Sequence, residues 1–159
     1  MLLQDVLYKV AIRSVTGSTS VEVSDIQIDS RKIRPGAVFV AVKGAAADGH
    51  QFIEKAVENG AMVIVYEDSG LRTPASRVTY VQVENSAAAA GYMAHNFFGK
   101  PSEKLKLVGV TGTNGKTTIA TLLYKLFARL GYTCGLISTV ENRIGTEVIP
   151  ATHTTPDAV

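Results

Sequence analysis

Cysteine is almost absent from this chain: its 159 residues include only Cys134, which therefore forms no disulfide within the chain. Charge is modest, with 16 Lys+Arg against 14 Asp+Glu, and no run of basic residues points to a nucleic-acid partner. No hydrophobic run is long enough to span a membrane, and the N-terminus, with its early Asp5, lacks the apolar core of a signal peptide. These shortages leave an ordinary globular composition, 46% hydrophobic, and favour a cytoplasmic protein.

The most informative stretch that the chain does have is a glycine-rich turn, Thr-Gly-Thr-Asn-Gly-Lys-Thr-Thr, at residues 111–118. The apolar run before it, residues 105–110, predicts a short buried strand. The apolar residues after it recur at helical spacing as far as Gly131. Such a turn between a strand and a helix is typical of nucleotide-binding loops. Glycines let backbone N–H groups approach phosphate oxygens, and the helix start carries partial positive charge.

Side chains of the turn suit the same chemistry. Lys116 is predicted to neutralise phosphate charge as the catalytic residue, and Thr117 is predicted to offer its hydroxyl to Mg²⁺. The general pattern has its first glycine at position 110, where this chain has Val110. The alternative is a tight turn with a surface lysine, which gives no reason for Lys116 and Thr117 to crowd a helix start. The predicted nucleotide-binding residues are Gly112, Thr113, Asn114, Gly115, Lys116, Thr117 and Thr118.

Strand and helix patterns alternate along the rest of the chain, which predicts an α/β fold with a largely parallel sheet. Strands are expected at residues 21–28, 37–42, 61–66, 78–83 and 133–140, and helices at 2–11, 52–59, 85–98 and 116–130. The polar segment 99–104 has the composition of a linker. We therefore expect an N-terminal α/β domain at 1–98, a linker at 99–104, and the first βαβ unit of a second, phosphate-loop domain at 105–159.

Two further groups of residues are candidates for binding. Asp29-Ser30-Arg31 follows a strand, where α/β sheets place ligands, but an Asx turn with Arg31 paired to Asp29 is the simpler explanation on local evidence. His153 precedes Thr154-Thr155-Pro156-Asp157, which has the pattern of a helix start and could contact an anion or a sugar, or simply cap the helix. Because the sequence stops at Val159, just after this start, we expect the N-terminal portion of a larger enzyme.

The glycine turn resembles the nucleotide loop of the Mur ligases and their folylpolyglutamate-synthetase relatives, in which the first glycine of the general pattern is not required. The segment from Asp29-Ser30-Arg31 through Asp48-Gly49-His50 to Gly60-Ala61 resembles the uridine-nucleotide domain of the same family. Thr154-Thr155-Pro156-Asp157, placed after the second strand of the ATP unit, is similar to the MurE branch. The resemblance covers nearly the whole chain.

The resemblance implies an ATP-dependent ligase of peptidoglycan precursor synthesis. Such an enzyme adds the third amino acid, diaminopimelate or lysine, to UDP-N-acetylmuramoyl-L-alanyl-D-glutamate through an acyl phosphate. The implied cofactors are ATP and Mg²⁺, and the implied partners are UDP-N-acetylmuramoyl-dipeptide and a free amino acid. The substrate-binding residues that the family pattern implies here are Ile28, Ser30, Ala45, Ala46, Ala47, His153, Thr154 and Thr155.

Two alternatives remain open at this point. One is another ligase, of the MurF or folylpolyglutamate type, and the other is a nucleotide-binding module without catalysis. We expect the 159 residues alone to be inactive in ligation, and we expect a monomer.

Overall fold

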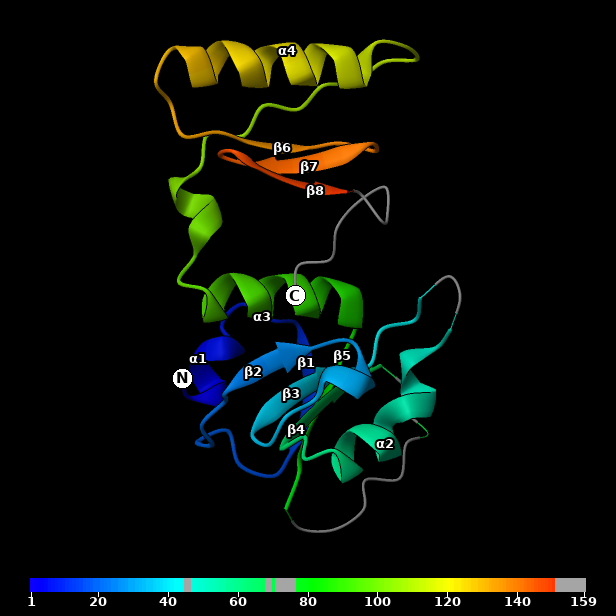
Figure 1. The fold of residues 1–159 in the computed structure, drawn as a ribbon. Coiled ribbons are helices and arrows are strands. Elements are labelled where there is room, and N and C mark those ends of the chain that lie inside the picture. Colours follow the sequence, from blue (N-terminus) through cyan, green and yellow to red (C-terminus); the bar gives the residue numbers. More distant parts are fainter. Residues whose placement is uncertain (45–46, 68–69, 71–76, 151–159) are drawn as a thin grey trace. The chain divides into compact units, whose positions relative to one another are not determined.

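The computed structural model describes residues 1–44, 47–67, 70 and 77–150. The chain divides into two compact units, one built from Met1–Leu105 and one from Lys106–Asp157 (Figure 1). None of the helices that the structure describes is both long and apolar enough to cross a membrane. The first unit carries most of the buried residues.

The first unit is built on a five-stranded sheet. Its strands lie in the order β1 (Ile12–Thr16), β5 (Thr79–Val83), β4 (Val63–Tyr66), β3 (Ala37–Val40) and β2 (Asp25–Gln27). The pairs β2–β3, β3–β4 and β4–β5 are parallel, and β1 is antiparallel to β5. Every residue of β3 and β4 is buried, as expected for central strands that helices cover on both faces. The predicted α/β class with a largely parallel sheet is confirmed.

Helices cover the two faces of this sheet in separate layers (Figure 1). Successive residues of a strand point to opposite faces, so Val38 and Val40 join one core cluster and Phe39 joins the other. The first cluster includes residues of α1 (Leu3–Val6) and α3 (Ser86–Phe97). The second includes residues of α2 (Ile53–Glu58), and η1 (Ser30–Lys32) and η2 (Gly49–Phe52) lie next to α2.

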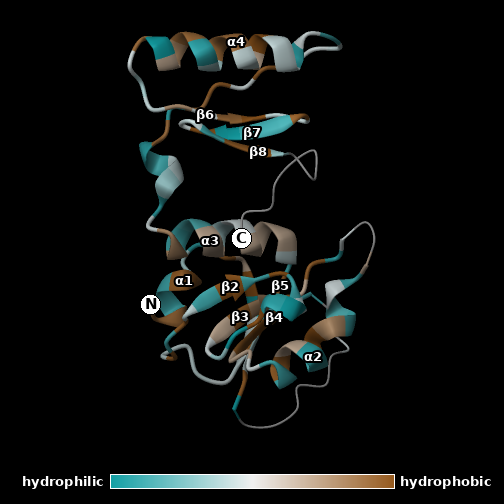
Figure 2. Cartoon of the chain, viewed as in Figure 1, coloured by the Kyte–Doolittle hydropathy of each residue, from teal (hydrophilic) through white to brown (hydrophobic). Residues whose placement is uncertain are grey.

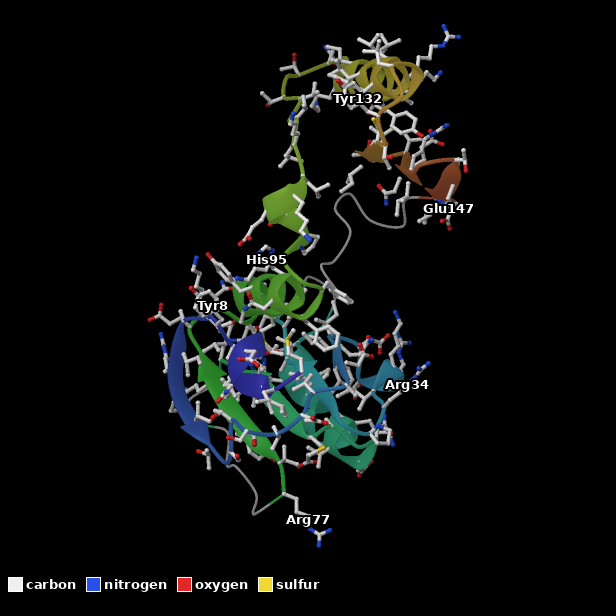
Figure 3. All side chains as sticks on the ribbon, turned by 90° about the vertical axis from the view of Figure 1, so that its left-hand side faces the viewer. Tyr8, Arg34, Arg77, His95, Tyr132 and Glu147 are labelled. Atoms are coloured by element: carbon white, nitrogen blue, oxygen red, sulfur yellow. The ribbon has the colours of Figure 1, made fainter. Side chains whose placement is uncertain are left out.

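The helix α3 is fixed at both ends. At its start the side chain of Asn85, the N-cap residue, accepts a hydrogen bond from the N–H of Ala88 at 2.7 Å. Near its end Asn96 donates to the carbonyl oxygens of Val6 at 3.0 Å and Tyr8 at 2.7 Å. Figure 3 shows Tyr8 beside the helix that carries His95. The chain then passes through η3 (Pro101–Lys104), where a linker was predicted.

The N-terminal segment differs from the prediction of one helix over residues 2–11. The helix α1 stops at Val6, and Lys9 has a left-handed backbone with φ of 62°. Residues Ile12–Thr16 then form the edge strand β1, which pairs with β5. The helical spacing of residues 2–11 therefore produces only a short helix, because an isolated helix of ten residues is only marginally stable.

The second unit contains α4 (Lys116–Arg129) and an antiparallel sheet. The strands of that sheet lie in the order β6 (Gly135–Ile137), β7 (Glu141–Ile144) and β8 (Glu147–Pro150). The predicted helix is confirmed, and Figure 2 shows hydrophobic and hydrophilic residues alternating along it. The predicted strand at 133–140 is shorter than expected, and β7 and β8 were not predicted.

The apolar run before the glycine turn does not form the predicted buried strand. Residues 105–110 belong to no strand, and the side chain of Leu107 is 92% exposed. A strand exists only when another strand pairs with it, and the described strands of the second unit pair with one another instead. The prediction of a buried strand at residues 105–110 is therefore wrong, although the run is largely apolar, because no described strand pairs with it.

Candidate functional site

The glycine turn adopts a backbone shape that depends on its glycines. Gly112 has φ of 148° and Gly115 has φ of 77°, conformations in which a side chain is strained. Gly115 occupies the N-cap position of α4, so the turn leads directly into the helix. The positive end of the helix macrodipole therefore lies at the turn.

The hydrogen-bond donors of the glycine turn are suited to the phosphate groups of the predicted nucleotide. The first helical bond joins the N–H of Ile119 to the carbonyl of Gly115 at 2.9 Å, so helix geometry leaves the N–H groups of Lys116, Thr117 and Thr118 without partners inside the helix. The ammonium of Lys116 folds back and donates to the carbonyl oxygens of Gly112 at 2.5 Å and Thr113 at 3.2 Å. Positive charge and backbone donors thus gather in one exposed loop, a donor set that fits the phosphates of ATP.

The loop has few groups of its own for a metal ion. Thr117 is half-buried, and it supplies one hydroxyl. Among the residues that the structure describes, no group of three or more His, Cys, Asp or Glu side chains is placed to hold a metal. Mg²⁺ usually keeps several waters and binds through one or two protein groups and substrate phosphates, so the predicted role of Thr117 fits this surrounding.

The Asp29-Ser30-Arg31 segment is a compact turn. The carboxylate of Asp29 accepts from the backbone N–H of Arg31 at 3.0 Å, and its two oxygens accept from the guanidinium at 2.9 and 2.8 Å. Hydrogen bonds from Arg31 lower the pKa of Asp29 to about 2. This is the Asx turn with a paired arginine that the sequence left open as the simpler alternative. It leaves Arg31 in solvent and Ser30 buried.

Besides belonging to the Asp29-Arg31 turn, Ser30 accepts a hydrogen bond from α2. The side-chain amide of Asn59, the C-cap residue of α2, donates to the carbonyl oxygen of Ser30 at 2.8 Å. Ile28 lies just before this turn and packs against the first core cluster. Because β2 and β3 are parallel, their carboxyl ends lie at the same edge of the sheet. Ile28 and Ser30 follow β2 at that edge, and the loop of residues 43–49 follows β3.

The loop after β3 is closed by backbone bonds. The N–H of Gly44 donates to the carbonyl of Ala47 at 3.0 Å, and Lys43 forms an isolated antiparallel bridge with Asp48. The N–H of Gly49 donates to the carbonyl of Val42 at 2.9 Å. Ala47 thus lies next to the backbone bonds that follow β3, at the same edge of the sheet as the Ser30 turn. Ala45 and Ala46, together with the predicted residues His153, Thr154 and Thr155, lie outside the described residues.

A polar network at the end of this loop was not recognised in the sequence. The ring of His50 contacts the Asp48 carboxylate at 2.6 Å through Nδ1 and accepts from the N–H of Glu67 at 2.9 Å through Nε2. The Glu67 carboxylate accepts from the backbone N–H of Ser86 at 2.6 Å and from its hydroxyl at 2.9 Å. The sequence shows no ligand-spaced partner for His50, so it does not indicate a metal site. The His50 ring is satisfied, and its partners lie up to 17 residues away, where no local pattern identifies them.

The network stabilises both of its carboxylates in their charged form. The hydrogen bond from the N–H of His50 is the main cause that lowers the pKa of Asp48. The hydrogen bond from the N–H of Ser86 is the main cause that lowers the pKa of Glu67. Lys43 acts in the same direction on both acids through its charge.

Each of the two units matches a model of a known protein family. Residues 22–98 match the model described as the Mur ligase family catalytic domain, and residues 110–159 match the Mur ligase middle domain. A protein of Cytophaga hutchinsonii named UDP-N-acetylmuramoyl-L-alanyl-D-glutamate–2,6-diaminopimelate ligase is 52% identical over 159 residues. A protein of Phocaeicola vulgatus with the same name is 50% identical over 159 residues. These matches cover 100% of this chain and 33% of each relative, so the chain spans about a third of their length.

Solved structures show the same fold. A structure of a UDP-N-acetylmuramoyl-L-alanyl-D-glutamate–2,6-diaminopimelate ligase superposes with a TM-score of 0.70 at 23% identity, covering 99% of this chain and 31% of that one. MurF from Acinetobacter baumannii superposes with a TM-score of 0.59 at 26% identity, covering 81% of this chain and 28% of the other.

Proposed function

This chain belongs to the Mur ligase family, and on that premise we propose that it is part of an ATP-dependent ligase of peptidoglycan precursor synthesis. The reaction proposed for the whole enzyme joins 2,6-diaminopimelate to UDP-N-acetylmuramoyl-L-alanyl-D-glutamate. The names and high identity of the relatives support diaminopimelate over lysine as the added amino acid. The enzyme would act in the cytoplasm as a monomer.

The glycine loop at 112–118 is the observation that carries the proposal. It combines two glycines of positive φ, a helix start and a lysine folded over the loop. ATP supplies the phosphoryl group that activates the substrate carboxylate for attack by the incoming amine. The backbone donors of Lys116, Thr117 and Thr118 would bind the phosphates. The ammonium of Lys116 would exchange its carbonyl partners for phosphate oxygens and offset their charge. Thr117 would contribute one ligand to Mg²⁺.

We further propose that the sheet edge after β2 and β3 binds the uridine end of the substrate. The residues assigned to it are Ile28, Ser30, Ala45, Ala46 and Ala47. What supports this is that the Ser30 turn and the described part of the loop after β3 emerge at one edge of a parallel sheet, where α/β folds place ligands. The proposed boundaries remain a substrate domain at 1–98, a linker at 99–104 and an ATP domain from 105 onward. His153, Thr154 and Thr155 are proposed to contact the muramoyl-dipeptide part.

The decisive experiment is a calorimetric titration of the 159-residue chain with ATP and Mg²⁺, comparing Lys116→Ala with Lys125→Ala. Both lysines lie exposed on α4, but Lys125 is remote from the glycine loop in the sequence. Loss of a charged donor to phosphate is expected to weaken binding roughly 10- to 100-fold in Lys116→Ala. Lys125→Ala is expected to bind like the unmodified chain. Equal affinity of the two variants would contradict the proposal.

A second measurement addresses the substrate and the catalytic competence of the chain. The chain is expected to bind UDP-N-acetylmuramoyl-L-alanyl-D-glutamate in the same calorimeter without ligating it to diaminopimelate. Phosphate release that depends on both substrates would show that these 159 residues are active by themselves, contrary to expectation. A flat titration at millimolar substrate would count against the uridine site.

A further inference from the structure

The turn at residues 28–32 lies beyond the end of an edge strand. The strand before it, β2, is three residues long and is the last in its sheet, so no described strand pairs with its outer side. The hydrogen bonds from Arg31 to the Asp29 carboxylate, and from the N–H of Lys32 to the Asp29 carbonyl at 3.0 Å, join residues of the turn to one another. Ordering a backbone segment costs conformational entropy, so contacts with the rest of the protein are needed to keep this turn in one shape.

Asn59 supplies a hydrogen bond to this turn from another element. Its side-chain amide donates to the carbonyl oxygen of Ser30 at 2.8 Å, and among the described residues no other side chain outside the turn forms a hydrogen bond with it. The peptide group between Ser30 and Arg31 is trans and planar, so its carbonyl and its N–H point in opposite directions. That N–H donates to the Asp29 carboxylate at 3.0 Å. One peptide group is therefore held at both ends, by Asn59 and by Asp29.

The amide of Asn59 projects from a fixed position at the end of α2. Asn59 is the C-cap residue, and its N–H donates to the carbonyl of Lys55 at 3.0 Å. Gly60 follows with φ of 101°, and its carbonyl accepts from the N–H of Gly36 at 3.2 Å. A Cβ at Gly60 would lie 3.1 Å from the Cα of Pro35. The end of α2 is thus packed against the turn that leads into β3, which gives the amide a firm support.

We propose that Asn59 is a positioning residue for the uridine end of the substrate: it holds the Ser30 turn in the orientation that binds the nucleotide. This role rests on the proposed uridine site, and only on the Ser30 turn within it, all of whose residues the structure describes. Asn59 does not itself touch the substrate, and it acts through the carbonyl of Ser30. A binding site whose backbone is already ordered loses less conformational entropy when the ligand binds, so this hydrogen bond raises affinity without contacting the ligand.

The test compares Asn59→Ala with Asn59→His in the 159-residue chain, titrated calorimetrically with UDP-N-acetylmuramoyl-L-alanyl-D-glutamate. Alanine removes the donor. Histidine keeps one, because its Nδ1 is bonded to Cγ, as the amide nitrogen of asparagine is, and a carbonyl oxygen that can only accept selects the ring form protonated at Nδ1. Loss of one hydrogen bond that orders the turn is expected to weaken binding about fivefold to tenfold in Asn59→Ala. Asn59→His is expected to bind within about twofold of the unmodified chain.

Glu58→Ala is the matched control at the same end of α2. The Glu58 side chain is exposed, and the change removes its ion pair with Lys55 without removing a bond to the Ser30 turn. Substrate affinity is expected to stay at the level of the unmodified chain in this control. Amide spectra establish that each variant is folded before the comparison. Asn59→Asp, which has the shape of asparagine but cannot donate when ionised, takes the place of Asn59→Ala if the alanine variant is unfolded.

Recovery of affinity in Asn59→His is the readout that a merely structural role would not produce. If Asn59 only stabilised the end of α2, urea denaturation would show a less stable Asn59→Ala chain whose folded form binds the substrate as tightly as Glu58→Ala does. Equal affinities of those two variants, or a histidine variant as weak as the alanine one, would overturn the role of Asn59 while leaving the uridine site intact. Absence of binding by the unmodified chain at millimolar substrate would instead overturn the proposed uridine site, and the role of Asn59 with it.

Discussion

At the scale of single residues, the Asp29 carboxyl in the turn with Arg31 has its pKa lowered to about 2. The pKa of Asp29 falls from an ordinary 3.8 to about 2 because Arg31 stabilises its ionised form. A carboxyl whose pKa is lowered on folding adds stability above its unfolded pKa and loses it as pH falls through the folded value. The contribution of this pair is therefore present at neutral pH and disappears between about pH 4 and about pH 2.

Asp29→Asn tests this pair while preserving the turn, because an asparagine side chain still accepts from the N–H of residue 31. The free energy of unfolding at neutral pH is expected to fall by less than about 1 kcal/mol, since Arg31 is exposed and water screens the attraction. Near about pH 2 the variant and the unmodified chain should be equally stable. Urea denaturation followed by circular dichroism measures both. The exposed acid Glu22, changed to Gln, is the matched control, and a deficit that persists at acid pH would contradict the assignment.

The candidate sites were predictable wherever the partners are close in sequence. The glycine loop and the Asp29-Arg31 turn are both local, and spacing and residue type identified them. The bonds of Asn59 to Ser30 and of His50 to Glu67 span 29 and 17 residues. They exist only because the sheet brings separate connections together, so no single segment carries a signal for them.

At the scale of whole elements, the helix α3 depends on the cap at its start. Asn85→Ala removes the acceptor for the N–H of Ala88 and is expected to lower the free energy of unfolding of the first unit by about 1 kcal/mol. Asn85→Ser keeps a capping oxygen and should recover most of the loss. Urea denaturation of the two variants side by side provides the measurement. No loss in either variant would mean that the bonds of Glu67 to Ser86, rather than Asn85, hold the helix start.

The central strands that were predicted correctly are buried against neighbouring elements. The strands β3 and β4 are continuous apolar runs in the sequence, and both are fully buried. The run at 105–110 is also largely apolar, yet Leu105, Leu107 and Val108 are exposed and the run is unpaired with the described strands. Composition indicates what a segment needs to bury, whereas the partner strand decides whether a strand forms. The edge strand β1 shows the converse, because its exposed residues form a strand through pairing with β5.

At the scale of the whole molecule, the two units differ in how much core they hold. The first unit has two clusters of buried residues, one on each face of its sheet. In the second unit Leu136 is the one buried residue among those described. The apolar side chains of α4, including Leu122 and Leu126, are exposed. Because burial of apolar surface is the main favourable term in folding, the second unit has far less to stabilise it.

We therefore expect the two units to unfold separately, the second well before the first. In native-state hydrogen exchange the amides of β3, β4 and β5 should be the most protected, because they lie in the paired and buried sheet. The amides of α4 should exchange far faster, although the helix is longer than any other described. An internal comparison with α3 controls for helical exchange in general, since that helix packs on the core. Equal protection of α3 and α4 would show that something covers the apolar stripe of α4 in solution, and it would refute the difference in stability argued here.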